Sequence, residues 1–321
     1  MIEDRKSILL LHNPNSGAFH ALSVIHALIS KLREANYDVE SHDSLDFFHQ
    51  RVDELSTSNR LRAVIAAGGD GTATAVAARI PSSIPMWLCP LGTENLLSRY
   101  LKMTREPEQA LASINRLQTR TLDAGLANGK LFLIVVGIGF DAEVVRQIHV
   151  NRRGHIRRWH YWLPIFKTAI RYRFPLLRLT DFGSTNSWIG STPEVQKYSS
   201  SEITQQRTID AAWFFLLNLP QYAAGLEIAP DAKGDDGLVD ICAFKHGGLF
   251  RGLAYFARLK LGIHRNLADF VHTRSAKFRI ESISSPQTEV SYQLDGDWGG
   301  CLPLEIESLP SRLCMIEPVL I

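Results

Sequence analysis

Cysteine is scarce in this chain, and its spacing excludes a disulfide scaffold or a zinc site. The 321 residues contain 4 cysteines, at positions 89, 242, 301 and 314. They lie far apart, mostly among apolar residues, and no interval between them matches a metal-ligand spacing. We interpret them as reduced thiols in the core of a cytoplasmic protein, because disulfides persist mainly in oxidising compartments.

Long hydrophobic runs are also missing. The longest, 131–140 and 211–217, fall short of the roughly 20 apolar residues that a membrane-spanning helix needs. The first six residues carry acidic as well as basic side chains, whereas a secretory signal peptide starts with a positively charged region. We therefore expect a soluble protein whose chain begins with a strand, and contact with a membrane surface stays open.

An excess of charge of one sign is absent from the chain as a whole. Lys and Arg number 35 against 33 Asp and Glu, a formal net charge of +2, and 45% of the residues are hydrophobic. This composition is typical of a folded core and excludes disorder and wholesale nucleic-acid binding.

One segment departs from that balance, because 144–180 contains no Asp or Glu. Its basic and aromatic residues are Arg146, Arg152, Arg153, Arg157, Arg158, Lys167, Arg171, Arg173 and Arg178, with Trp159, Tyr161, Trp162, Phe166, Tyr172 and Phe174. The mixture suits an anionic membrane surface. A helix with a buried aromatic face and a solvated basic face is nearly as well supported. Nucleic acid ranks third and is not expected as a partner, because no recognised nucleic-acid motif accompanies the segment.

Short apolar runs alternate with stretches of helical spacing in the first third of the chain. Strands are predicted at 8–11, 37–40, 61–65 and 86–88, and helices at 21–35, 47–55, 73–80, 96–101 and 107–117. This alternation implies a parallel sheet with crossover helices. Three of its loops leave the carboxyl ends of strands, where ligands bind in open α/β sheets.

After residue 121 most segments have β-type composition. Strands are predicted at 131–136, 212–217, 239–244, 278–283 and 290–294, and a Ser- and Thr-rich loop at 183–206. We therefore predict an α/β fold with an N-terminal Rossmann-like parallel-sheet domain, 1–122, and a second, mainly antiparallel β domain, 123–302. A last strand at 313–316 is expected to return to the first domain, which 303–321 would complete.

The run Ala66–Thr72, Ala-Ala-Gly-Gly-Asp-Gly-Thr, joins a buried strand to an Ala-rich helix. In this layout backbone amides and a helix N-terminus meet a phosphate. The run is neither a Walker loop nor Gly-x-Gly-x-x-Gly. Asp70 would repel a phosphate unless it holds a metal ion or accepts a proton. The alternative is a tight turn with a solvated Asp.

Further motifs follow this loop in an order that resembles the diacylglycerol kinase catalytic family of bacterial lipid kinases, in the superfamily of diacylglycerol, sphingosine and NAD kinases. The matching stretches are 13–17, 66–72, 90–95, 137–142, Asn218, 229–232, 235–240 and 293–297. They span nearly the whole chain, and the ordered set is far more specific than any single motif. The family resemblance implies ATP and Mg²⁺ as cofactors.

The resemblance also implies which residues bind the nucleotide. They are Asn13, Pro14, Asn15, Ser16, Gly17, Gly68, Gly69, Asp70, Gly71, Thr72, Thr93 and Asn95. Backbone amides of the glycine loop would hold the phosphates, and the hydroxyls of Thr72 and Thr93 would contact phosphate or metal. For these hydroxyls the structural alternative is helix capping.

Two further roles come from the resemblance. Asp236, with the backbone carbonyls of Lys233 and Leu238, is expected to form a metal site in the second domain, although these residues also suit an ordinary polar turn. Asp295 and Asp297 belong to the closing motif, which is the first choice for receiving the proton of the acceptor hydroxyl, with Asp70 second. The alternative is a hairpin turn, because Asp-Gly is a strong hairpin signal.

We therefore predict an ATP-dependent lipid kinase that transfers the γ-phosphate of Mg-ATP to a lipid hydroxyl of the diacylglycerol or sphingoid type. An NAD kinase-like enzyme is the nearest alternative, and the second-domain motifs disfavour it. A non-catalytic lipid- or nucleotide-binding regulator is the other, because Thr74, Ala75, Leu96 and Asp297 depart from the family pattern. A homodimer and peripheral contact with the inner membrane surface stay open.

Overall fold

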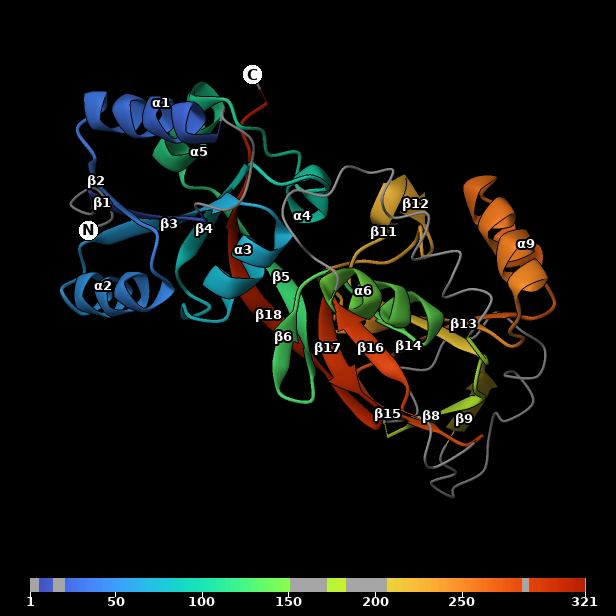
Figure 1. Cartoon of the computed structure of the whole chain (residues 1–321). Helices are drawn as coiled ribbons and strands as arrows, with labels where there is room; N and C mark the ends of the chain where they lie inside the picture. Colours follow the sequence, from blue (N-terminus) through green and yellow to red (C-terminus); the bar gives the residue numbers. More distant parts are fainter. Residues whose placement is uncertain (1–5, 14–20, 151–171, 183–206, 285–288, 321) are drawn as a thin grey trace. The chain divides into compact units, whose positions relative to one another are not determined.

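The computed structural model describes residues 6–13, 21–150, 172–182, 207–284 and 289–320 (Figure 1). The chain divides into two compact units, one formed by 1–123 with 310–321 and the other by 124–309. The expected loop at 183–206, nucleotide-loop residues 14–17 and much of the basic segment lie outside the described residues. Within the described part, every helix is too short or too polar to cross a lipid bilayer.

The first unit is built on a parallel sheet. Its strands are β1 (Ser7–His12), β2 (Asp38–His42), β3 (Leu61–Gly68), β4 (Pro85–Pro90) and the C-terminal end of β18 (Leu304–Ile316). They are ordered β2-β1-β3-β4-β18, with parallel pairing throughout. From β1 the chain continues to β2 on one side, and from β3 it continues to β4 on the other. The boundary between β1 and β3 is therefore the topological switch point of the sheet.

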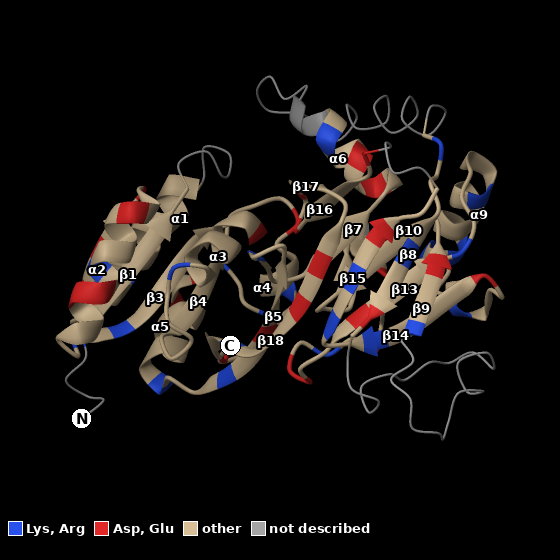
Figure 2. Cartoon of the chain, turned by 90° about the horizontal axis from the view of Figure 1, so that it is seen from below, with Lys and Arg blue, Asp and Glu red and all other residues tan. Residues whose placement is uncertain are grey.

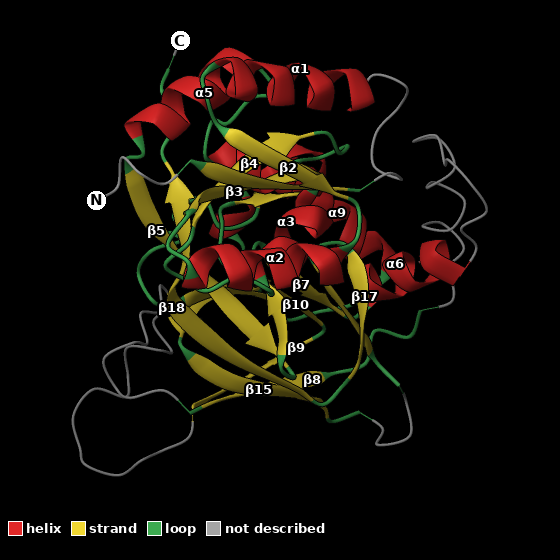
Figure 3. Cartoon of the chain, turned by 90° about the vertical axis from the view of Figure 1, so that its left-hand side faces the viewer, coloured by secondary structure: helices red, strands yellow, loops and turns green. Residues whose placement is uncertain are grey.

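Helices cover both faces of this sheet. They are α1 (Ala21–Glu34), α2 (Leu45–Thr57), α3 (Asp70–Ala77), α4 (Leu96–Tyr100) and α5 (Pro107–Arg116). Figure 3 shows α1 and α5 on one face and α2 and α3 on the other. All of β3 is buried as a result, which explains why its sequence is apolar except for Arg62. The guanidinium of Arg62 donates to the Ile114 carbonyl of α5. The predicted parallel-sheet domain is confirmed.

The second unit contains a separate antiparallel sheet. Its order is β14-β13-β10-β7-β16-β17. The strands are β7 (Val135–Ile138), β10 (Trp213–Leu217), β13 (Val239–Phe244), β14 (Phe270–Ser275), β16 (Ser291–Leu294) and β17 (Asp297–Cys301). A small ribbon of β11 (Gln221–Tyr222) and β12 (Leu226–Glu227) and the 3₁₀ turns η2 (Ala223–Gly225) and η3 (His264–Asn266) connect its strands.

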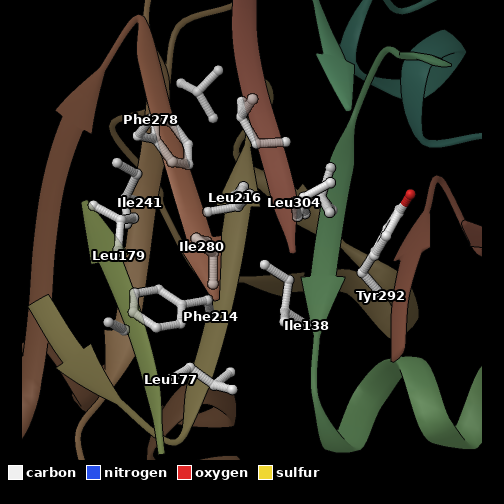
Figure 4. Close-up of a cluster of buried hydrophobic side chains, with 14 of the residues drawn as sticks. Ile138, Leu177, Leu179, Phe214, Leu216, Ile241, Phe278, Ile280, Tyr292 and Leu304 are labelled. Atoms are coloured by element: carbon white, nitrogen blue, oxygen red, sulfur yellow. The ribbon is translucent and has the colours of Figure 1, made fainter. Parts of the chain in front are cut away.

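Further antiparallel strands form the opposite layer of this unit. They are β5 (Thr119–Ala127), β6 (Lys130–Phe132), β8 (Leu177–Asp181), β9 (Arg207–Ala211), β15 (Lys277–Ser282) and the N-terminal end of β18. Side chains of the two layers meet in one hydrophobic core, where Phe214 and Leu216 face Leu179, Phe278 and Ile280 (Figure 4). The predicted antiparallel β domain is therefore confirmed as a sandwich of two layers.

The sequence missed two helices in this unit, did not predict strands β5, β8, β9, β14 and β17, and misjudged the bounds of two others. Helix α6 (Phe140–Val150) starts at the end of an apolar run, and α9 (Leu249–Lys260) contains Gly252, which lowers helix propensity. The expected strand 131–136 is split into β6 and β7, and β18 is longer than the predicted 313–316.

The sandwich core gives a direct test of this fold. Phe278 is 0% exposed, and Phe47 on α2 is 66% exposed. We expect Phe278→Ala to lower the free energy of unfolding by about 3–5 kcal/mol, because it leaves a cavity. The control Phe47→Ala should change it by no more than about 0.5 kcal/mol. Urea unfolding followed by circular dichroism measures both, and equal losses would contradict the assigned core.

Candidate active site

The glycine loop packs against the loop that follows β4. The Gly68 carbonyl accepts a hydrogen bond from the Leu91 amide at 2.9 Å. Gly69 and Gly92 meet backbone to backbone, since a Cβ added to Gly92 would lie 2.5 Å from the Gly69 Cα. Glycine is therefore required here for close approach of the two loops. Both loops leave carboxyl ends of neighbouring strands of the first unit.

Asp70 joins these two loops through its carboxylate. Oδ2 accepts the Leu96 amide at 3.0 Å and Oδ1 accepts the Leu97 amide at 3.1 Å. These amides belong to the first turn of α4, where backbone donors lack a partner within the helix. Burial raises the pKa of the Asp70 carboxyl, and the two amide hydrogen bonds act in the opposite direction.

The neighbouring polar residues have mainly local partners. Asn95, with φ of 50°, closes its loop, since its Oδ1 accepts the Gly92 amide at 3.0 Å and its Nδ2 donates to the Gly92 carbonyl at 2.8 Å. The Thr72 side chain is buried beside Gly68. Thr93 is exposed on the same loop as Asn95, and Asn13 is exposed where β1 ends. The nucleotide-binding assignments of these residues stay predictions.

Asp295 is held by backbone amides of a distant segment. Its carboxylate accepts the amides of Leu133, Ile134 and Val135 at 2.8, 2.9 and 3.0 Å. Leu133 and Ile134 lie between β6 and β7, and Val135 begins β7, so the amides that turn toward Asp295 stand where the predicted strand is split. Asp295 and Gly296, with φ of 49° and 91°, form the two-residue turn between β16 and β17.

The hairpin interpretation of this closing motif therefore describes its backbone. Asp297 begins β17 and is exposed. The catalytic roles assigned to Asp295 and Asp297 stay predictions, and the structure adds a second role for Asp295. Three amide donors use most of the roughly four lone-pair sites of a carboxylate.

Asp236 is paired with an arginine. Its Oδ1 accepts the Leu238 amide at 3.1 Å, and its Oδ2 accepts a hydrogen bond from Arg274 at 3.0 Å. Burial raises the pKa of the Asp236 carboxyl, and Arg274 opposes this rise. Lys233 is exposed in the preceding turn.

This donor set is a poor fit to a metal ion, because Arg274 already supplies the positive charge beside the single carboxylate. The residues that the structure describes contain no group of three or more His, Cys, Asp or Glu placed to hold a metal. The metal site at Asp236, Lys233 and Leu238 stays a prediction, and we assign it no chemical step.

The second unit contains a pocket of about 270 Å³ with apolar walls. Its aromatic rings come from α6, β10, β11, β13 and α9, and they are Phe140, Trp213, Phe215, Tyr222, Phe244, Tyr255 and Phe256. Neighbouring rings pack on one another. The ring centroids of Phe140 and Trp213 are 5.3 Å apart, and those of Phe244 and Tyr255 are 4.6 Å apart. The walls therefore favour an apolar ligand.

One carboxyl group lines this pocket, that of Asp141 in the first turn of α6. Its Oδ1 accepts the Tyr222 hydroxyl, and its Oδ2 accepts the Gln293 side-chain amide at 3.1 Å. Burial raises the pKa of the Asp141 carboxyl, against the effect of these two hydrogen bonds. Asp141 and Tyr222 keep part of their surface exposed, and both face the pocket.

Sequence reasoning placed Asp141 in a motif but did not single it out. The available signal was an acidic residue directly after a buried apolar run, where a carboxylate is costly unless it has partners. Those partners, Tyr222 and Gln293, are distant in sequence, so the composition of the motif could not identify them.

Comparison with known proteins follows the division into two units. Residues 7–127 match the family model described as the diacylglycerol kinase catalytic domain. Residues 134–317 match the YegS C-terminal NAD kinase beta sandwich-like domain. A diacylglycerol kinase of Mycobacterium tuberculosis is 26% identical, over 97% of this chain and 95% of the relative. One of Bacillus subtilis is 24% identical, over 98% and 97%.

Solved structures share the fold. A crystal structure of a Bacillus anthracis protein superimposes with a TM-score of 0.70 at 21% identity, and the match covers 97% of both chains. The crystal structure of a diacylglycerol kinase from the same organism gives a TM-score of 0.62 at 18% identity. With two family models in the expected order, the chain belongs to the diacylglycerol kinase family of lipid kinases and carries the family's NAD kinase-like C-terminal domain.

Proposed function

We propose that this protein is an ATP-dependent lipid kinase that transfers the γ-phosphate of Mg-ATP to the hydroxyl of a diacylglycerol-type lipid. The observation that carries the proposal is the apolar pocket with a single carboxyl group, Asp141, in a chain of the diacylglycerol kinase family. A lipid alcohol matches this arrangement, because it has an apolar body and one reactive polar end.

The nucleotide half of the proposal rests on the glycine loop. The backbone amides at the start of α3, among them that of Gly71, suit phosphate oxygens, and the helix N-terminus favours negative charge. This loop follows β3 at the switch point of the sheet, where ligands bind in folds of this kind.

Asp70 is the carboxylate beside these amides, and it is the candidate to hold Mg²⁺ directly or through water. Its two amide hydrogen bonds leave lone pairs for such a contact. When bound, Mg²⁺ would neutralise charge that develops on the phosphates. Asp70 would then both hold the loops together and counter the charge of the metal.

The lipid half rests on the apolar walls of the pocket and on the one carboxyl group that lines it, that of Asp141. Burial raises the pKa of this carboxyl group, and the hydrogen bonds from Tyr222 and Gln293 act in the opposite direction. Diacylglycerol is uncharged and needs only a hydrogen-bond partner for its hydroxyl. The apolar walls and the single carboxyl group suit this lipid, and the relatives that are diacylglycerol kinases support the same acceptor.

The two alternatives fit these observations less well. An NAD kinase acts on a large polar substrate, whereas the pocket is lined by aromatic and aliphatic side chains. A regulator without catalysis would keep the pocket and the glycine loop, so only an activity assay separates it from the kinase. The assay should supply labelled ATP with diacylglycerol, a sphingoid base, ceramide and NAD, and identify the product by mass.

We expect phosphorylated diacylglycerol as the main product, and near-complete loss of turnover in Asp70→Asn. The substitution removes the charge and places an NH₂ group against an amide of α4. Asp46→Asn is the matched control, because Asp46 also lies in the first turn of a helix but is exposed. Thermal melts show whether each variant is folded. A folded Asp70→Asn enzyme with wild-type turnover would reduce Asp70 to a structural residue.

Narrowing the pocket should weaken lipid binding selectively. Val144 lines it from α6, and the adjacent Val145 does not. We expect Val144→Trp to raise the KM for diacylglycerol by roughly tenfold, because the larger side chain displaces lipid surface from the walls, and to leave the KM for ATP unchanged. Steady-state kinetics with Val145→Trp as control measures this effect. A change in the KM for ATP alone would argue against lipid binding in the pocket.

Asp295→Asn tests whether the closing motif is catalytic as well as structural. The new NH₂ group would face one of three backbone amides, so we expect the free energy of unfolding to fall by about 1–3 kcal/mol. Asp297→Asn, at an exposed position, should change it by less than about 0.5 kcal/mol.

The catalytic part is measured well below the melting transition of the variant. If Asp295 receives the hydroxyl proton, kcat should fall by roughly 10²-fold or more, with ATP affinity close to wild type in calorimetry with a non-hydrolysable analogue. Wild-type kcat in the folded variant would make Asp295 a residue that only holds the turn.

A further inference from the structure

Helix α9 exposes a row of large apolar side chains. Phe250 is 85% exposed, Leu253 59% and Leu261, directly after the helix, 70%. Ile263, two residues further along the chain, is 45% exposed. Single exposed apolar residues are ordinary, but a contiguous group of this kind marks an interaction surface.

These exposed residues do not lie on the face of α9 that packs against the second unit. At 100° per residue, Phe250, Leu253, Ala257 and Leu261 project from one side of the helix. Tyr255 and Leu259 project from the opposite side, where they are buried.

That inner side also belongs to the lipid pocket. Tyr255 and Leu259 line the pocket together with Phe256, which is 44% exposed. One face of α9 therefore closes the pocket while the other is available to a partner.

The charges around the exposed row have a single sign. The stretch 245–268 contains no Asp or Glu. Arg251 and Arg258 lie on one flank of the apolar row, and Lys260 lies on the other. Figure 2 shows α9 with basic and uncharged segments only.

Neighbouring groups only partly offset these charges. Arg251 pairs with Asp269 at 3.3 Å, and the Lys260 ammonium lies 5.8 Å from the centre of the Phe256 ring. Among the described residues, neither Arg258 nor Lys260 has a carboxylate within ion-pair distance. Arg258 and Lys260 are thus available to an anionic surface.

This pattern distinguishes between occupants of the face. A second copy of the chain in a two-fold dimer would place the same patch against itself and bring its cations together. An anionic bilayer offers apolar depth for the central row and phosphates for both cationic flanks. Phe47 on α2 and Leu22 on α1 are also exposed, at 66% and 57%, but they are single residues on separate helices.

We propose that α9 is a membrane-docking helix, which lies in the plane of an anionic bilayer with Phe250, Leu253 and Leu261 inserted. The inner face of the same helix lines the pocket, so docking would bring the pocket wall to the surface that supplies the lipid. The proposal goes beyond the kinase reaction, and its test requires neither ATP nor turnover.

The test is co-sedimentation of the full chain with vesicles of phosphatidylglycerol and phosphatidylcholine. The double variant Phe250→Ser with Leu253→Ser should bind at least about tenfold more weakly than wild type, because two large side chains no longer insert. The matched control, Leu22→Ser with Phe47→Ser, removes two other exposed apolar residues of the same types, on α1 and α2, and should bind like wild type.

A charge variant tests the flanks separately. Arg258→Gln with Lys260→Gln should reduce binding to vesicles that contain phosphatidylglycerol, most strongly at low ionic strength, where screening is weakest. Binding to pure phosphatidylcholine should not change, because that surface carries no net charge. Equal loss on both kinds of vesicle would contradict the electrostatic part of the proposal.

Other occupants of the face give different results. If a second copy covers it, light scattering will find a wild-type dimer that the Phe250→Ser/Leu253→Ser variant converts to a monomer, and vesicle binding will not change. If another segment of the same chain packs on this face, the Phe250→Ser/Leu253→Ser variant will melt several degrees below wild type. Either result, or equal sedimentation of wild type and variant, would overturn the docking role.

The outcome is separable from that of the proposed kinase. Turnover of a short-chain, water-soluble diacylglycerol should be equal in wild type and the Phe250→Ser/Leu253→Ser variant, since neither residue lines the pocket. Absence of turnover in both proteins would count against the kinase proposal and leave the vesicle result unaffected. Loss of soluble-substrate turnover in the variant alone would show that α9 acts on the pocket and not on a membrane.

Discussion

The hydrogen bonds from the Leu96 and Leu97 amides to the Asp70 carboxylate are the constraint on which the first unit's site depends. The start of a helix leaves backbone donors without partners, and a carboxylate is the strongest acceptor that can satisfy them. By accepting both amides, Asp70 ties the start of α3 to the start of α4. The backbone contact of Gly69 with Gly92 is possible because these two loops are held together.

The second unit repeats this device. The Asp295 carboxylate accepts the amides of the two residues between β6 and β7 and of the first residue of β7, so the closing motif is anchored to the strand beside it. Asp141 is held differently, by the side chains of Tyr222 and Gln293 at the wall of an apolar pocket. Carboxylates that are expected to act on phosphate, metal or hydroxyl are therefore also parts of the scaffold, and their loss should affect folding as well as chemistry.

The pocket and α9 link recognition of a lipid to the place where lipids are found. Aromatic side chains from several elements surround one carboxyl group, that of Asp141. The helix that closes this pocket exposes apolar residues flanked by cations on its other side. A short helix can serve both purposes because its 3.6-residue period separates the two sets of side chains onto opposite faces.

The sequence by itself determined the parallel sheet, the antiparallel second domain and the family, because alternating periodicity and ordered motifs are local properties of the chain. Helices α6 and α9 were hidden, one by the apolar run before it and the other by Gly252. Only the tertiary structure showed that Asp70 and Asp295 accept distant amides, that Arg274 pairs with Asp236, and that Asp141 lines a pocket. Each of these contacts joins residues far apart along the chain, and the spacing of a motif carries no information about a partner that folding brings to it.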